Sequence, residues 1–402
     1  MLELDAGLEF NQEQDTEFFS LLPEKPGVCL ITSRQPGAEP YLIRSADLRR
    51  RLKRLLGPPD AASKRLNLRD FAQLVRYRET GSAFEQALTY YHQAKQLFPK
   101  RYRALMRLRP AAVLKINLRN AYPRCFVTRR ILVNEQGEPT SGAYYGPFPS
   151  RRSAQAFAEK MLDFFKVRRC QIKIRRDPTF PGCLYSEMKM CLAPCFAGCS
   201  KEEYDVEVDR LVQFLDTSGG SLRDTFTRER ESASEQLDFE KAAAIHKKLE
   251  KLDDALRGQP ELARRIQNLD AVILQRTTEG QAVALFAVHA GRLAEPYRLK
   301  FADTSKPASA EETVRDYLEN VLNTTPQTTS NLRQAAGELG EHLALVARWF
   351  FSNPREGEIF FRKKDWPYRR ILRACSRLLA AQPEPGSNGG VLPDQAQSEE
   401  TK

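Results

Sequence analysis

The chain has 402 residues, a net charge of +11 and an apolar content of 41%, which is enough to build several domains with real cores. No apolar run approaches the roughly 20 residues of a membrane helix, and the acidic start carries no signal-peptide pattern. These features predict a cytoplasmic protein without membrane contact. In that reducing compartment, the eight cysteines are expected as metal or cluster ligands rather than as disulfides.

Charge is distributed unevenly along the chain. Residues 100–130 hold ten Lys or Arg and no Asp or Glu, whereas residues 201–255 hold fifteen acidic and nine basic residues. This contrast predicts a nucleic-acid face beside helices that bind another protein. The arginines expected to contact DNA phosphates are Arg44, Arg49, Arg50, Arg101, Arg103, Arg129, Arg130, Arg151 and Arg152.

The chain opens with a small α/β pattern. Residues 1–20 are expected as a loose N-terminal arm, and residues 21–110 as one domain. In that domain, a turn and an apolar run predict a strand over 28–31, and a second short strand follows over 41–43. The next residues predict a capped helix over 48–55, with leucines on one face and cations on the other.

Residues 111–200 form the second predicted region. Two apolar runs between 111 and 133 predict strands, and GAYYGPFPS at 142–150 leads into a helix that delivers Cys170. The aromatic side chains of this Gly-Pro loop can either pack on their own domain or stack on bases among nearby arginines. These aromatic residues are Tyr144, Tyr145 and Phe148.

Five cysteines fall within residues 170–199. Four of them have the spacing C-x12-C-x7-C-x3-C, and these are Cys170, Cys183, Cys191 and Cys195. Four thiolates suit zinc or an iron–sulfur cluster equally well on ligand softness. The spacing fits no common zinc ribbon. Cys199 lies a further x3 interval along and could compete as a ligand.

The helical region, residues 201–258, contains a predicted antiparallel hairpin. Its two helices are expected over 222–236 and 239–257, with the turn at Leu237 and Asp238. Small alanines allow the helices to approach closely, and an exposed aromatic at the turn can fill a groove on a partner. The residues expected to bind that partner are Leu237, Phe239, Ala242, Ala243, Ile245 and Leu249.

The last predicted region mixes strands and helices. Strands are expected over 269–274 and 282–288, and helices over 310–321 and 331–351, within a region that ends at 380. Residues 381–402 are rich in Pro, Gly, Ser and Glu and are expected to be disordered.

Several motifs together carry a family resemblance. GAYYGPFPSRRSA at 142–154, the cysteine spacing, and LDFEKAAAIHKKL at 237–249 resemble the UvrC and Cho family of bacterial excision-repair nucleases. The resemblance implies an α+β multidomain chain that binds DNA. Its parts are a GIY-YIG-like domain over 21–110, a cysteine-cluster region over 111–200, a UVR hairpin over 201–258 and a truncated RNase H-like remnant over 259–380.

The resemblance also implies a cofactor and a partner. It places a four-iron cluster on the four spaced cysteines, and zinc is the alternative metal for the same four ligands. The hairpin resembles the UVR motif through which UvrC pairs with UvrB, so a UvrB-like protein is the expected partner. The UvrA–UvrB damage complex is the wider assembly to consider.

The catalytic positions of the family's GIY-YIG nuclease are poorly matched. Tyr41 and Arg51 align with a retained tyrosine and the catalytic arginine, whereas Cys29 replaces the other tyrosine. The position of the metal-binding glutamate is Tyr90, and a phenol cannot hold a hard divalent cation as a carboxylate does. Glu85 lies one helical turn away and could in principle substitute for it. Other departures from the family pattern are Ile43, Arg44 and Tyr102.

Three functions remain open from the sequence. The first is a DNA-binding protein that docks on UvrB-type partners without incising DNA and without a catalytic divalent metal. The second is a Cho-like endonuclease with a rearranged metal site that makes a single incision in damaged DNA. The third is a UVR-mediated adaptor outside repair.

Overall fold

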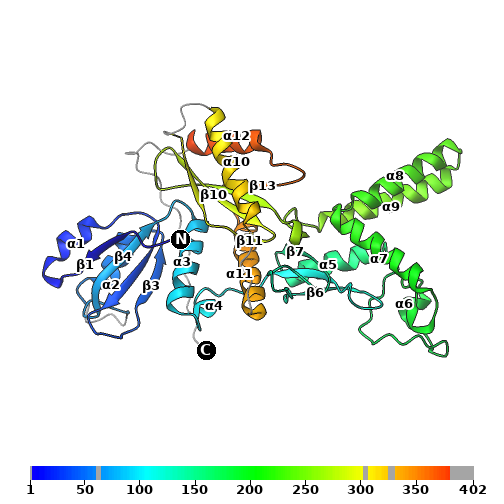
Figure 1. Cartoon of the computed structure of the whole chain (residues 1–402), viewed down its shortest axis with the longest axis horizontal. Coiled ribbons are helices and arrows are strands. Elements are labelled where there is room, and N and C mark those ends of the chain that lie inside the picture. The colour runs from blue at the N-terminus through cyan, green and yellow to red at the C-terminus, as the bar shows by residue number, and fades with distance from the viewer. Residues whose placement is uncertain (1, 60–64, 302–306, 325–330, 381–402) are drawn as a thin grey trace.

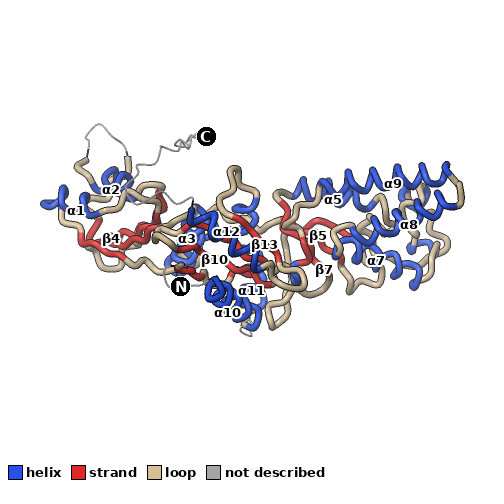
Figure 2. Tube along the Cα trace, turned by 90° about the horizontal axis from the view of Figure 1, so that it is seen from above, coloured by secondary structure: helices blue, strands red, loops and turns tan. Residues whose placement is uncertain are grey.

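A computed structural model describes residues 2–59, 65–301, 307–324 and 331–380, which form an elongated α+β molecule (Figure 1). Three antiparallel sheets follow one another along the long axis. A helical hairpin forms the end opposite the first sheet in both views (Figures 1 and 2). No described helix is long and apolar enough to cross a membrane. The tail predicted as disordered lies outside the described residues.

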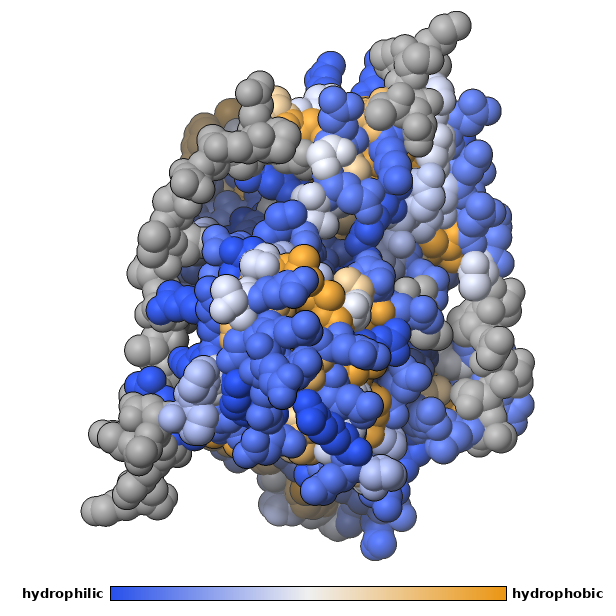
Figure 3. Space-filling view, turned by 90° about the vertical axis from the view of Figure 1, so that its left-hand side faces the viewer, coloured by the Kyte–Doolittle hydropathy of each residue, from blue (hydrophilic) through white to orange (hydrophobic). Residues whose placement is uncertain are grey.

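The first sheet has the strand order β1-β4-β2-β3. Its strands are β1 (Ala6–Glu9), β2 (Gly27–Ser33), β3 (Tyr41–Ser45) and β4 (Ala72–Glu79). Its helices are α1 (Asp15–Leu21), α2 (Leu48–Leu56) and α3 (Ala83–Leu97), and the short α4 (Tyr102–Leu105) follows them. Asp47 caps α2 by accepting from the Arg50 N–H at 2.9 Å. The surface at this end of the molecule is mostly hydrophilic, with scattered apolar side chains (Figure 3).

The prediction of a loose arm over residues 1–20 is wrong. β1 pairs antiparallel with β4 and so becomes the edge of the first sheet. Phe18 and Phe19 on α1 are buried together with Phe10, and the Phe10 and Phe18 rings meet edge to face at 5.0 Å. The burial of three aromatic side chains together stabilises the folded form of this segment, although its composition is acidic.

The second sheet has the order β6-β5-β7-β8 and is covered by α5 (Arg151–Leu162). Its strands are β5 (Ala112–Ile116), β6 (Cys125–Thr128), β7 (Ala143–Phe148) and β8 (Arg264–Arg265). Every residue of β7 is buried, so its aromatic side chains pack within the protein rather than forming a platform for bases. α5 ends at Leu162, and an extended segment rather than the helix leads to Cys170.

The third sheet has the order β11-β10-β9-β13, with β12 also paired to β10. Its strands are β9 (Ala271–Arg276), β10 (Ala282–His289), β11 (Arg292–Leu293), β12 (Tyr297–Lys300) and β13 (Glu358–Phe361). The helices α10 (Pro307–Asn323) and α12 (Tyr368–Ala380) cover one face of the sheet, and α11 (Leu332–Phe350) packs on the other. β13 was not predicted from the sequence.

α11 is buried along most of its length and contacts α3, β7 and β11. One hydrophobic core runs through side chains of all three sheets and of this helix. His342 lies inside that core, where burial lowers the pKa of its ring to about 3. The neutral ring accepts a hydrogen bond from the Leu293 N–H at 3.1 Å. The three sheets therefore share one hydrophobic core instead of forming separate domains.

The helical hairpin agrees closely with its prediction. α8 (Gly220–Glu235) and α9 (Phe239–Arg257) pack against each other, and α7 (Lys201–Asp216) precedes them. Gly219 has a positive φ of 86° and separates α7 from α8. A Cβ atom there would lie 2.5 Å from the Leu256 side chain, so the close approach of α9 also requires glycine.

Candidate functional site

The positions that the family resemblance assigns to catalysis meet between β3 and α3. Tyr41 and Arg44 lie on β3, and Tyr90 lies on α3, which packs against that strand. The Arg44 guanidinium carbon is 5.9 Å from the centroid of the Tyr90 ring. Burial raises the pKa of the Tyr90 phenol, while Arg44 partly opposes that rise and Tyr41 adds to it. Tyr90 thus lies against Arg44 at the position where the family resemblance leads us to expect a carboxylate.

Two further positions lie on the other face of the first sheet, because Cys29 and the leucines of α2 share one hydrophobic core while α3 packs in another. Arg51 lies on α2, which packs on β2 and β3, and its side chain is half-buried. Cys29 is fully buried on β2, opposite Ile43 of β3 and Tyr77 of β4. Burial raises the pKa of the Cys29 thiol far above its ordinary value, so it offers no reactive thiolate.

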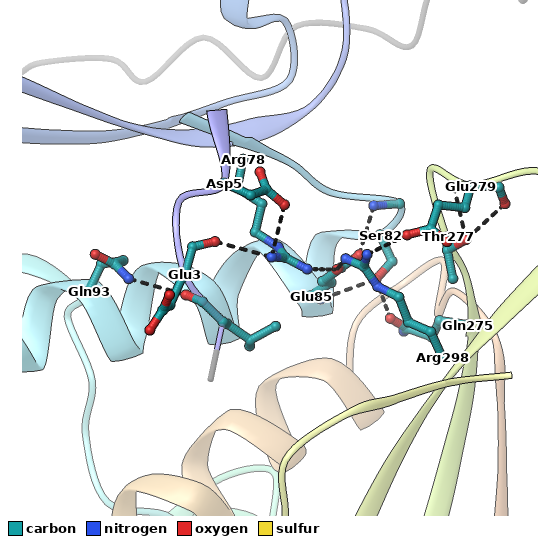
Figure 4. Close-up of polar contacts among 12 residues, drawn as sticks. Glu3, Asp5, Arg78, Ser82, Glu85, Gln93, Gln275, Thr277, Glu279 and Arg298 are labelled. Atoms are coloured by element: carbon teal, nitrogen blue, oxygen red, sulfur yellow. Dashed lines mark hydrogen bonds and ion pairs between the residues drawn. The ribbon is translucent and has the colours of Figure 1, made fainter. Parts of the chain in front are cut away.

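Glu85 is the carboxylate that could substitute, and the structure engages it elsewhere (Figure 4). The residue is 2% exposed, and its two carboxylate oxygens accept from the Gly81 N–H at 2.9 Å and from Arg298 at 3.1 Å. Arg78 approaches at 3.7 Å. Because Arg298 belongs to β12, Glu85 ties the first sheet to the third. Removing one partner of a buried ion pair destabilises a folded protein by about 3–5 kcal/mol, so the Glu85 carboxylate contributes to the stability of the fold.

The far end of α3 is tied to α11 in a similar way. Glu341 is buried on α11 and accepts hydrogen bonds from the Tyr91 hydroxyl at 2.7 Å and the Tyr102 hydroxyl at 2.8 Å. Arg103 adds a charged contact at 2.5 Å. Tyr102, which stands at the family's asparagine position, therefore serves a helix–helix contact.

The predicted DNA-contacting arginines divide into three groups. Arg49, Arg101 and Arg103 are held in ion pairs with Glu24, Glu39 and Glu341 respectively. Arg44 contacts Tyr90, and Arg50 is exposed on α2. Exposed arginines without an ion pair in the described part of the chain are Arg129, Arg130, Arg151 and Arg152.

A groove of about 330 Å³ lies where β5, the end of β7 and α11 meet. Four arginines line it, Arg107 and Arg109 from before β5, Arg129 from after β6, and Arg348 from α11. None of the four has an acidic ion-pair partner within the described ranges. Ser150, which caps α5, lines the same groove. The N-terminus of α5 therefore lies beside four arginines that have no acidic ion-pair partner among the described residues.

Arg348 is held against the segment before β5. Its guanidinium donates to the carbonyls of Met106 at 3.2 Å and Arg107 at 3.0 Å. Burial lowers the pKa of Arg348, and the positive charge of Arg44 lowers it further. The sequence does not place Arg348 beside the other groove residues because it lies far along the chain. Arg107 and Arg109 lie in the acid-free stretch over residues 100–130.

The four spaced cysteines lie in a largely irregular segment beside the second sheet. Cys183 precedes the short α6 (Leu184–Glu187), Cys195 lies in a 3-10 turn, and Cys191 accepts from the Ala193 N–H at 3.3 Å. The buried Arg168 fastens this segment to the sheet, because it donates to the Tyr122 carbonyl at 2.8 Å and approaches the Cys170 sulfur at 3.8 Å.

The four thiols lie within one another's electrostatic reach. Burial raises the pKa of the Cys191 thiol to about 11, and Cys170, Cys183 and Cys195 each add to the rise. Cys199 differs because its side chain is packed in the hydrophobic core of the second sheet, and among the other four thiols only Cys195 contributes to the rise in its pKa. Within the described ranges, no three His, Cys, Asp or Glu side chains are grouped closely enough to hold a metal ion.

The predicted partner-binding residues occupy different places on the hairpin. Leu237 and Phe239 stand at its tip with exposed fractions of 72% and 66%. Ala243 is exposed, and Ala242 and Leu249 are half-buried. Ile245 is buried between α8 and α9, so it holds the hairpin together instead of facing a partner.

Comparison with known proteins adds sequence relatives. Residues 111–214 match the family UvrC/Cho excinuclease, middle domain. The UvrABC system protein C of Dehalococcoides mccartyi is 27% identical over 273 residues, which is 68% of this chain and 44% of that protein. The UvrABC system protein C of Thermoanaerobacter sp. is 26% identical over 393 residues, 94% of this chain and 61% of that protein. No solved structure matches the chain.

The chain spans roughly two fifths to three fifths of the length of these curated relatives. The middle-domain match contains all four spaced cysteines, and the longer alignments extend over most of the chain. Residues 111–214 thus carry the similarity to the UvrC/Cho excinuclease middle domain, and most of the chain is distantly similar to UvrABC system protein C.

Proposed function

We propose that the protein is a non-incising member of its family, one that binds DNA in excision repair and docks on a UvrB-type partner. The observation that carries this proposal concerns two side chains of α3, those of Tyr90 and Glu85. Tyr90 stands at the metal-ligand position against Arg44, and both oxygens of Glu85 are engaged with Gly81 and Arg298. Phosphodiester hydrolysis in this family needs a divalent cation that a carboxylate holds.

An incision assay tests this proposal directly. The protein is expected to leave lesion-bearing duplex DNA intact with Mg²⁺ or Mn²⁺, with or without UvrA and UvrB, because the metal-ligand position is a phenol. Metal-dependent nicking that Arg51→Gln abolishes and Lys53→Gln preserves would establish the alternative, a Cho-like endonuclease. Lys53 is the matched control because it is an exposed cation on the same helix.

DNA binding is assigned to the arginine groove. Its four cations have no acidic partners in the described part of the chain. Unpaired guanidinium groups in a shallow groove suit the phosphate backbone, which they contact without reading base sequence. The pocket is too small for a duplex, so it receives single phosphates along a longer path.

Neutralising the groove should weaken DNA binding and its dependence on salt. For a triple change of Arg107, Arg109 and Arg129 to Gln, the slope of log K against log salt should fall by about 0.9 for each lost phosphate contact. Fluorescence anisotropy over a salt series measures this slope. The control is a change of the exposed Lys241, Lys247 and Lys251 on α9 to Gln, which removes equal charge elsewhere. Equal losses in both triple variants would contradict the assignment to the groove.

The cysteine site is assigned a four-iron cluster, with zinc as the alternative. The donor type fits, because all four candidates are thiols in one segment, and the Ala193 N–H and Arg168 point hydrogen-bond donors at two of the sulfurs. In the described residues the thiols are not grouped closely enough to hold a single metal ion. A cluster binds each thiolate through a different iron, so it needs the sulfurs less close together than a single zinc ion does. When bound, the cluster would cross-link the irregular segment to the second sheet.

Metal analysis of anaerobically purified protein tests this assignment. Cys183→Ser should lose the bound iron and the visible absorption of thiolate-bound iron, since it removes one of four ligands. Cys199→Ser should keep both, because Cys199 is packed in the hydrophobic core. Zinc in place of iron would select the alternative metal. Retention of metal by Cys183→Ser with loss in Cys199→Ser would overturn the ligand set.

The tip of the hairpin is assigned the partner contact. Leu237 and Phe239 expose apolar side chains at the end of two helices that project from the body of the molecule (Figure 1). Large exposed apolar side chains at a projecting tip favour docking on an apolar groove. The complementary hairpin of a UvrB-type protein is the proposed partner.

Truncating the tip should weaken partner binding without unfolding the chain. Leu237→Asn suits the positive φ of 61° at that position, and Phe239→Ala removes a mostly exposed ring. Together they are expected to lower affinity for UvrB by at least about thirtyfold, the loss typical of hot-spot residues. Glu240→Gln on the same turn is the control. Unchanged UvrB affinity in the double variant, measured by calorimetry, would contradict the assignment of the partner contact to the tip. A lack of UvrB binding by the unmodified chain would favour the adaptor hypothesis.

The division into domains also stays a proposal. Residues 21–110, with the added N-terminal strand and helix, are assigned the GIY-YIG-like domain, and residues 201–258 the UVR hairpin. The RNase H-like description of residues 259–380 remains a prediction, and every described strand pair in that region is antiparallel.

A further inference from the structure

A second polar cavity, of about 520 Å³, opens where α7 ends and β8, β9, β10 and β13 come together. It shares no lining residue with the arginine groove. Its lining includes four cations and two acids, which are Arg264, Arg265, Arg362, Lys363, Asp216 and Asp270. His289 and the amides of Gln267 and Asn268 complete the polar part of the wall. None of these residues belongs to the centre between β3 and α3, to the cysteine site or to the hairpin.

Asp270 fixes the position of the histidine. Its carboxylate oxygen Oδ1 lies 2.8 Å from His289 Nδ1 and accepts the Ala290 N–H at 3.1 Å. Burial would raise the pKa of Asp270, but the hydrogen bonds from His289 and Ala290 bring it below its ordinary value. The carboxylate is therefore charged, and with Nδ1 occupied, Nε2 is the ring nitrogen left for another partner.

The two acids match only part of the positive charge. Asp216 pairs with Arg265 at 2.9 Å and also accepts the Tyr145 hydroxyl at 2.9 Å. Asp270 is shared between His289 and Arg362, whose guanidinium is 3.4 Å from Oδ2. A purely structural role, the fastening of β9 to β10, accounts for Asp270 and His289. It leaves the other cations of the wall without an explanation.

Arg264 and Lys363 are those remaining cations. Neither has an ion pair within the described residues, although both line the cavity. The central carbon of the Arg264 guanidinium lies 4.2 Å from the centroid of the Phe361 ring, a contact that helps to hold the group in place. Burial lowers the pKa of Arg264, and the charge of Glu261 only partly opposes this.

Gln267 supplies an observation of a different kind. Its Nε2 donates to the Pro139 carbonyl at 3.2 Å, while its Oε1 is buried with no hydrogen-bond partner. This oxygen has no accessible surface, so it is not open to a ligand in the cavity. The feature that distinguishes the cavity is therefore its unmatched positive charge, which suits a phosphate group.

We propose that this cavity binds the phosphate of a nucleotide at the end of a DNA strand. Arg264, Lys363 and His289, which line the same cavity, would hold the phosphate. A terminal phosphate carries more charge than an internal diester, so it suits cations that have no counter-charge of their own. The proposal rests on the proposed DNA-binding function and adds an end-specific contact to it. A free mononucleotide has the same chemistry and is the other source.

The test compares strand ends in binding measurements on the full chain. Labelled single strands with a 5′-phosphate, a 3′-phosphate or hydroxyl ends are titrated by fluorescence anisotropy. One of the phosphorylated ends should bind about tenfold more tightly than the hydroxyl end, the effect of roughly one charged hydrogen bond. Lys363→Gln and Arg264→Gln should each reduce that preference and leave affinity for the hydroxyl strand unchanged.

Matched controls separate binding from folding. Lys363 is exposed, so its substitution is compatible with an intact fold, and the adjacent exposed Lys364→Gln is the control that should keep the preference. A deoxynucleoside monophosphate that competes for the site would identify the free nucleotide as the ligand. Failure to compete, with the end preference intact, would identify the strand end.

Two results would overturn the inference. One is equal affinity for all ends together with no mononucleotide binding. The other is an end preference that survives both substitutions. In either case, retained affinity for the hydroxyl strand would leave the proposed DNA-binding function standing. Mononucleotide binding without affinity for any strand would instead refute that function and keep the cavity assignment.

Discussion

The burial of α11 on nearly all its sides is the constraint on which the rest of this structure depends. A helix covered all round needs neighbours on each face, and α11 takes them from all three sheets through α3, β7 and β11. Its buried carboxylate, Glu341, must be matched by donors, and Tyr91, Tyr102 and Arg103 provide them. These directional contacts fix how α3 lies against α11, whereas apolar packing alone would allow it to slide.

The same contacts give the polar side chains of α3 structural partners. The resemblance places a metal-binding carboxylate and an asparagine on or just beyond α3, where this chain has Tyr90 and Tyr102. One of these tyrosines contacts Arg44 and the other Glu341. Glu85 has become the anion that joins α3 to β12. Polar groups that a catalytic centre would keep available for substrate are here engaged with other parts of the protein.

Local signals in the sequence were enough to predict much of the fold. The hairpin helices were placed within two residues at their ends, because an apolar stripe, Asp238 as a cap and a breaking glycine pair all act within a few residues. The N-terminal strand and β13 were missed because each depends on a partner strand far along the chain. The partners of Glu85 and the fourth arginine of the groove were missed for the same reason. Spacing along the chain identified the cysteine set, while only packing distinguishes Cys199 from it.

The close approach at Gly81 shows how tightly the first and third sheets are joined. A Cβ atom at that residue would lie 2.4 Å from the Thr277 backbone, so the two main chains touch with no side chain between them. With Glu85 beside this contact and a shared hydrophobic core behind it, neither sheet can unfold without exposing buried surface of the other. The sheets should therefore melt in one cooperative transition rather than domain by domain. A fragment ending near residue 110 would lose the surface that covers Tyr91 and Leu88, and it would be prone to aggregate instead of behaving as an independent domain.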